Sequence, residues 1–171
     1  MYFAAVTIVC GCCGAELGEV PTVWAFSAPD YWGAPEAGSE SFLEDELCCI
    51  DAPELDERHF FIRGLIEVPV RDSDEHLTYN VWVSLSPANF ERAVERWDDP
   101  ARDEEKPYFG WLSNNIPGYP DTLQLKTRVH TRQPGLRPLV ELEPTDHPLA
   151  VEQRDGIDAH RLAEVAKVCG G

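Results

Sequence analysis

Basic residues are scarce in this sequence of 171 residues, which contains 14 Lys and Arg against 31 Asp and Glu and carries a formal net charge of -17. Such an acidic surface repels phosphate backbones and anionic lipid headgroups, so the composition argues against nucleic acid and membranes as partners. The same charge would attract and steer a basic protein. An acidic surface can also serve solubility alone, and both interpretations stay open.

Long apolar runs are also missing, because no stretch approaches the roughly 20 apolar residues that a membrane-spanning helix needs. The apolar start "MYFAAVTIVC" has no Lys or Arg before it, and Val9 is not the small residue that an export cleavage site requires. We therefore expect a cytoplasmic protein whose cysteines are reduced.

Length and composition predict one folded domain, residues 1–171, with 43% hydrophobic residues. Apolar patterns predict strands at 2–9, 59–70, 77–86, 108–113, 121–131 and 136–143, and helical periodicity with capping signals predicts helices at 87–98, 148–156 and 158–168. The sequence lacks internal repeats and the βαβ alternation of parallel sheets. The predicted fold class is α+β: a single domain with a mostly antiparallel sheet, helices packed on one face and an N-terminal CxxC turn.

Residues 18–46 mix Pro, Gly, Ser and acidic residues, which predicts a long irregular excursion over the surface. Trp24, Tyr31 and Trp32 lie in this segment. These aromatic side chains either tie the excursion to the domain or form an apolar binding surface, so Trp24 and Trp32 are candidate binding residues.

Three of the six cysteines lie within "CGCCG", where Cys10 and Cys13 form a CxxC in a glycine turn that can direct two thiolates at one metal. A structural zinc site needs four donors, and Cys48 is the candidate third. Cys12 or Cys49 is the candidate fourth, with a histidine or a carboxylate as the remaining choice. Two alternatives stay open: buried apolar thiols, and a redox pair, for which the glycines and proline that follow make a poor helix start.

Two polar groupings are further candidate sites. Arg63 and Glu67 share one face of a predicted strand, where they form an ion pair, a binding face or an ordinary solvated face. Asp146, His147 and Glu152 form the densest polar cluster and are weak candidates for acid–base catalysis. Helix capping explains the same cluster, and neither a nucleophile nor a phosphate-binding loop accompanies it.

These observations predict a non-catalytic binding or interaction module. An immunity-like role against a basic partner is one concrete form, and it depends on size and charge alone. The alternatives are an enzyme that uses the Asp146, His147 and Glu152 region, and a structural module stabilised by zinc.

Several longer strings, "LCCID", "VWVSLSPANF", "LSNNIPGYPDTLQLKTRV" and "RPLVELEPTDHPLAVEQRDGI", follow "CGCCG" in an order that resembles the bacterial family catalogued as domain of unknown function 2199. The resemblance extends from about Cys10 to Val165 and implies no established activity. The family pattern has CxxCG, a histidine three residues later and a later cysteine before Ile-Asp. Cys10, Cys13 and Cys48 match this pattern, whereas Leu17 occupies the histidine position. The resemblance therefore implies that a zinc site of three thiols and an imidazole would lack its fourth ligand in this chain unless Cys12 or Cys49 replaces the histidine.

Overall fold

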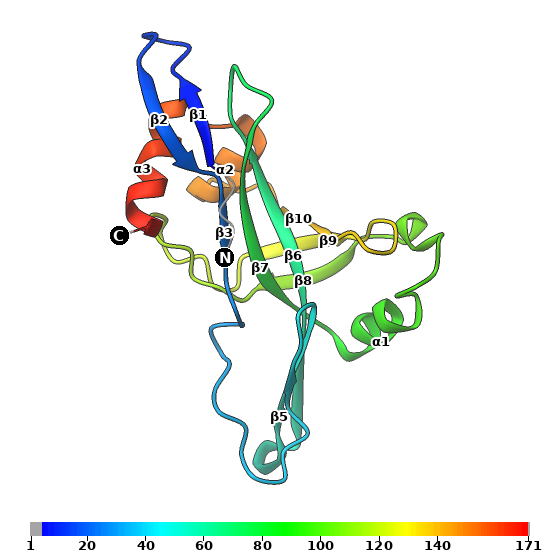
Figure 1. The fold of residues 1–171 in the computed structure, drawn as a ribbon. Helices are drawn as coiled ribbons and strands as arrows, with labels where there is room; N and C mark the ends of the chain where they lie inside the picture. Colours follow the sequence, from blue (N-terminus) through cyan, green and yellow to red (C-terminus); the bar gives the residue numbers. More distant parts are fainter. Residues whose placement is uncertain (1–4, 171) are drawn as a thin grey trace.

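The computed structural model describes residues 5–170, and it is a single α+β domain in which strands predominate (Figure 1). The first part of the strand predicted at 2–9 lies outside the described residues. Two strands, β1 (Ala5–Val9) and β2 (Glu16–Pro21), form a small antiparallel sheet. The other strands form one sheet in the order β3-β7-β8-β9-β10-β6-β5-β4: β3 (Val23–Ala25), β4 (Phe42–Leu43), β5 (Leu47–Ala52), β6 (Glu57–Pro69), β7 (His76–Leu85), β8 (Tyr108–Leu112), β9 (Lys126–His130) and β10 (Leu139–Leu142).

Five of these strands form a closed circuit of pairings. The long strands β6 and β7 pair as an antiparallel hairpin, β8, β9 and β10 follow in turn, and β10 returns to β6. All pairings in the circuit are antiparallel except the last, where Leu139 lies beside Leu65 in parallel. The mostly antiparallel sheet predicted from the sequence is confirmed, and its inner face encloses the core.

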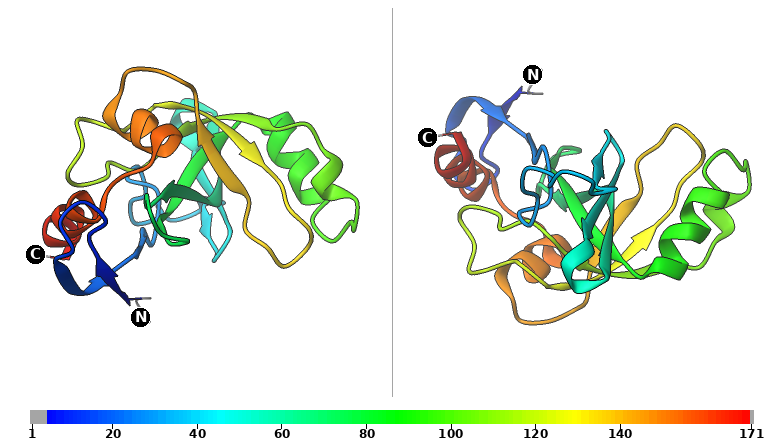
Figure 2. Two further views of the ribbon diagram at one scale, coloured as in Figure 1. Left: turned by 90° about the horizontal axis from the view of Figure 1, so that it is seen from above. Right: turned by 90° about the horizontal axis from the view of Figure 1, so that it is seen from below.

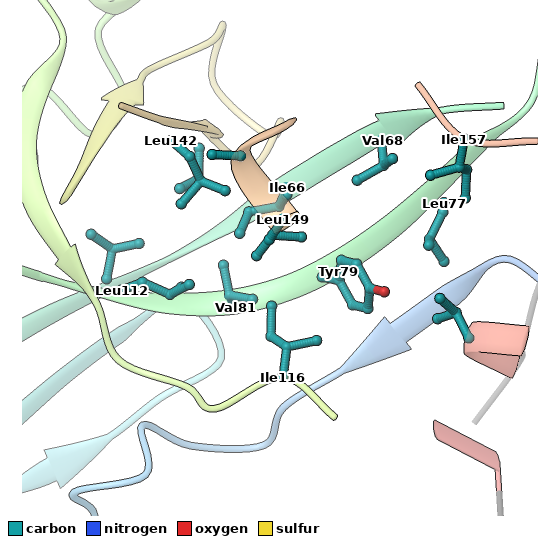
Figure 3. Close-up of a cluster of buried hydrophobic side chains, with 14 of the residues drawn as sticks. Ile66, Val68, Leu77, Tyr79, Val81, Leu112, Ile116, Leu142, Leu149 and Ile157 are labelled. Atoms are coloured by element: carbon teal, nitrogen blue, oxygen red, sulfur yellow. The ribbon is translucent and has the colours of Figure 1, made fainter. Parts of the chain in front are cut away.

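The core follows from strand alternation, because every second residue of β6 and β7 points inward. Figure 3 shows Ile66 and Val68 from β6 facing Leu77, Tyr79 and Val81 from β7, and all five side chains are buried. The outer face of β7 is also covered, since Trp82 is fully buried. Its cover is the excursion, whose irregular part is shorter than predicted because β2, β3 and β4 occupy the ends of residues 18–46.

Three α-helices surround the sheet: α1 (Pro87–Glu95), α2 (Pro148–Asp155) and α3 (Ala159–Gly170). Ser86 caps α1, since its side chain accepts a hydrogen bond from the backbone N–H of Asn89. Helix α2 packs on β6 and β10, whereas α3 packs on β2. Both views in Figure 2 show α3 beside the β1–β2 hairpin, with α1 at the opposite side of the molecule. No helix within residues 5–170 is long and apolar enough to cross a membrane.

Strand β9 is shorter than the strand predicted at 121–131. It begins at Lys126 because Gln124 adopts a positive φ of 62°, which extended chain does not allow. The N–H of Gln124 donates to the carbonyl of Leu112, so the segment before β9 turns across the end of β8. From Lys126 onward, exposed and buried residues alternate along β9.

Gly110 in β8 provides a test of how tightly the circuit is packed. A Cβ at this position would lie 2.5 Å from the carbonyl oxygen of Ser84 and against the side chain of Val83. We expect Gly110→Ala to lower the free energy of unfolding by about 1–3 kcal/mol, the usual cost of overpacking. Gly33→Ala is the matched control, since a Cβ at Gly33 meets no atom within 4 Å. Urea unfolding curves of both variants measure the difference, and equal stabilities would contradict the close packing.

Candidate functional site

The N-terminal thiols lie in a tight turn between β1 and β2. The N–H of Gly14 donates to the carbonyl of Cys10 at 2.8 Å, and Gly14 has a positive φ of 71°, which glycine adopts without strain. The sulfur of Cys10 is buried, lies 2.8 Å from the sulfur of Cys12 and accepts the N–H of Cys12 at 3.4 Å. The turn therefore gathers thiols on one side, as the sequence predicts.

A histidine from the far end of the chain completes this group. The Nε2 atom of His160, on the first turn of α3, lies 3.5 Å from the sulfur of Cys13. The ligand atoms of Cys10, Cys12, Cys13 and His160 all lie within 4.8 Å of one another, and we call these four residues the thiol–imidazole cluster. Sequence reasoning left a histidine open as the fourth donor but could not select His160, because 147 residues separate it from Cys13.

The hydrogen bond between the two neighbouring sulfurs divides their acidities. It lowers the pKa of Cys10 to about 7, and backbone N–H groups of the turn add to this effect. The same hydrogen bond, followed by desolvation, raises the pKa of Cys12 to about 12. Of these two thiols, Cys10 thus becomes a thiolate more readily near neutral pH, and the thiolate is the form that binds metals.

Cys48 and Cys49 do not join the cluster, contrary to the prediction for Cys48. They lie on β5, which pairs with β4 and β6 and lies at the opposite end of the molecule from the β1–β2 hairpin (Figure 1). Cys48 is fully buried beside Phe61 and Trp82, and desolvation raises its pKa to about 12. It is a small apolar core group, and the expectation failed because β5 does not lie beside the first strand.

The candidate acid–base residues hold the two C-terminal helices in place. His147 is the N-cap of α2, where its Nδ1 accepts the N–H of Leu149. Glu152 accepts a hydrogen bond from the hydroxyl of Tyr119 and a second, 2.8 Å long, from the Nε of Arg161 on α3. Asp146 lies just before α2 and is exposed. His147 and Glu152 thus each have a structural partner.

The candidate binding residues of the excursion and of β6 lie at different places. Trp24, on β3, packs against the main core and lies near the end of α3, since a Cβ at Gly170 would lie 3.2 Å from its ring. Trp32 is half-buried and packs against the group of Cys48, Phe61 and Trp82. Arg63 donates to the carbonyl of Phe26 at 2.8 Å and lies over the Trp82 ring, so it anchors the excursion. Glu67 occupies the same face of β6, opposite Thr78.

A cavity of about 360 Å³ opens on the outer face of β5, β6, β7 and β8. We call it the aromatic cavity. It is lined by Tyr31, Ile50, His59, Phe61, Ser84, Trp111, Ser113 and Gln124. Tyr31 extends from the excursion and stacks on Phe61 with 6.4 Å between ring centres. Strand alternation in β6 and β8 could have revealed Phe61 and Trp111 as outward aromatic residues, but only the fold shows that they share one hollow with Tyr31.

These features define the class of the molecule: a small, strand-rich α+β domain with a cysteine cluster near its N-terminus. A family described as an uncharacterized protein conserved in bacteria, DUF2199, matches residues 9–157, and the chain belongs to this family. No curated protein and no solved structure matches the chain. Leu17, at the histidine position of the family pattern, packs against the core, and His160 lies beyond the matched region.

Proposed function

We propose that this protein is a non-catalytic binding module that takes a cationic side chain of a basic partner into the aromatic cavity. The observation that carries the proposal is the meeting of Tyr31, Phe61 and Trp111 in one hollow of ligand-binding size on the outer face of the sheet. The faces of such rings attract Lys and Arg side chains by cation–π interactions. An immunity-like role is the form of this function in which the basic partner is a protein to be neutralised.

Charge supports a cationic occupant. The net charge of -17 attracts basic partners from a distance. Next to the aromatic cavity, a second hollow shares Tyr31 and Ile50 and has the acidic residues Glu36, Asp51 and Glu54 in its lining. One cation of the chain itself already lies near one of these rings, since the Nζ of Lys126 is 6.0 Å from the centre of Trp111. A peptide with several basic residues would therefore find an aromatic hollow and an acidic hollow side by side.

The cavity wall is held in place before any partner arrives. Asp30, next to Tyr31, receives hydrogen bonds from the side chain of Asn114 at 2.9 Å and from the N–H of Asn115 at 2.8 Å. Asn114 is fully buried and also accepts the N–H of Trp82. These contacts fasten Tyr31 over the outer face of the sheet, so little conformational entropy is lost when the cavity is filled.

Titration with a short oligolysine peptide at low salt tests this function. We expect binding that weakens at high salt and weakens about tenfold in Trp111→Ala, since a desolvated cation–π contact contributes about 1–2 kcal/mol. The same peptide with acetylated lysines should not bind. Leu136→Ala is the control, because Leu136 is an exposed apolar residue outside the cavity.

If salt weakens binding but the wild-type protein and Trp111→Ala bind the peptide with equal affinity, the attraction comes from the acidic surface as a whole. The aromatic cavity would then not be the binding site. Absence of oligolysine binding at low salt would contradict the proposed function itself.

A further inference from the structure

We propose that Cys10, Cys12, Cys13 and His160 bind one zinc ion and that this ion fastens the β1–β2 hairpin to α3. The ligand atoms of the four residues lie within 4.8 Å of one another, although they come from opposite ends of the chain. Four donors with three sulfurs and one imidazole nitrogen are a complete ligand set for a structural zinc site. The inference is independent of the aromatic cavity, which none of these four residues lines.

The distances suit tetrahedral coordination after a small adjustment. Zinc–sulfur bonds of about 2.3 Å place two sulfurs of a tetrahedral site about 3.8 Å apart. The contact of 3.5 Å between Cys13 and His160 is close to the separation that coordination requires. The sulfurs of Cys10 and Cys12 are 2.8 Å apart and must separate by about 1 Å, which rotation about χ1 of the exposed Cys12 provides.

Both halves of the site are positioned by contacts of their own. On one side, the N–H of Cys10 donates to the carbonyl of Ala15 and the N–H of Cys12 points at the Cys10 sulfur, so the turn is formed without the imidazole. On the other side, α3 is held by the ion pair of Arg161 with Glu152 at 2.8 Å and by the fully buried Leu162. His160 precedes Arg161 on the same helical turn, so the docking of α3 delivers the imidazole to the thiols.

The chemistry of the ligand set selects zinc. Binding replaces the protons of three thiols, which pass to solvent, while the imidazole coordinates through the neutral Nε2. No electron is transferred, so the site needs neither an oxidant nor a reductant. Three thiolates and one imidazole fill all four coordination positions of a tetrahedral zinc ion. The absence of an open position for water or substrate distinguishes a structural zinc site from a catalytic one.

Elemental analysis and cobalt substitution of the purified full-length protein test the proposal. We expect one zinc per chain, and visible absorption of tetrahedral Co²⁺ with sulfur charge-transfer bands in the substituted protein. His160→Ala should weaken zinc binding at least about a hundredfold, since loss of a ligand exceeds the tenfold to hundredfold cost of losing an outer hydrogen-bond partner. Cys13→Ser should reduce the charge-transfer absorption by about one third, because one of three thiolates is lost.

Matched controls separate the site from its surroundings. Cys169→Ser removes a thiol from the same helix, and His76→Ala removes an imidazole from the start of β7; both variants should retain zinc. Near-ultraviolet circular dichroism checks that every variant keeps its folded core. Three outcomes would overturn the proposal: a folded protein that binds no zinc under reducing conditions, zinc that is retained in His160→Ala, or zinc that is lost in Cys48→Ser but not in Cys13→Ser.

Discussion

Removal of zinc with a chelator is expected to speed amide hydrogen exchange in β1, β2 and α3 by at least about a hundredfold while the amides of β6 and β7 keep their protection. The reason is the position of the proposed site, which connects a two-stranded sheet and a helix that lie outside the closed circuit of strands. Binding free energies of structural zinc sites are about 10–16 kcal/mol, so loss of the ion removes a large local stabilisation.

The variant His160→Ala, prepared without zinc, is the control for direct effects of the chelator. Without any chelator, it should show the exchange pattern of the wild-type protein after zinc removal. A rise of exchange that is uniform across the chain would mean that the ion stabilises the whole domain rather than this end. Unchanged exchange in β1, β2 and α3 would contradict the fastening role of the site.

Arg102→Met is expected to lower the free energy of unfolding by about 3–5 kcal/mol, because it removes a buried charged donor that several backbone carbonyls share. Arg102 is only 4% exposed. Its guanidinium donates to the carbonyls of Trp97 at 2.8 Å, Leu136 at 2.9 Å and Arg132 at 2.5 Å, and it lies over the Trp97 ring. It thereby joins the segment after α1 to the connection between β9 and β10.

Urea unfolding followed by tryptophan fluorescence measures this effect. Arg92→Met is the matched control, since Arg92 pairs with Glu105 at the surface with about half of its side chain exposed, and a surface ion pair contributes little. Methionine retains most of the apolar stem in both variants, so the comparison isolates the guanidinium. Similar stabilities of the two variants would show that the carbonyls around Arg102 find other donors.

The sequence predicted the elements whose signals are local. The caps of α1 and α2 and the inward face of β7 could be read from Ser86, Gly156 and the alternation of apolar residues, and the structure contains all of them. The closure of β10 onto β6 could not be predicted in this way. It depends on a single parallel pairing of residues 139 and 65, and no local pattern encodes which strands meet across such a distance.

The candidate sites also differ in whether their residues carry a local sequence signal or meet only through the fold. The glycine turn identified Cys10 and Cys13 as neighbours and Cys12 as a candidate further ligand, and the three cysteines lie together in the structure. Cys48 was misplaced because a CxxC and a second cysteine pair carry no information about whether their strands are adjacent. His160 was not selected because a single histidine in an amphipathic helix has no metal-binding signature until the helix is packed on β2.

The closed circuit of strands also governs how copies of this protein meet in concentrated solution. Within residues 5–170, the eight-stranded sheet ends in β3 and β4, which are three and two residues long. Short outer strands offer few unpaired backbone groups to which a second chain could add a strand. The excess of 31 acidic over 14 basic residues makes identical molecules repel one another at neutral pH. The eight-stranded sheet is therefore doubly protected from pairing with the same sheet of a neighbouring molecule.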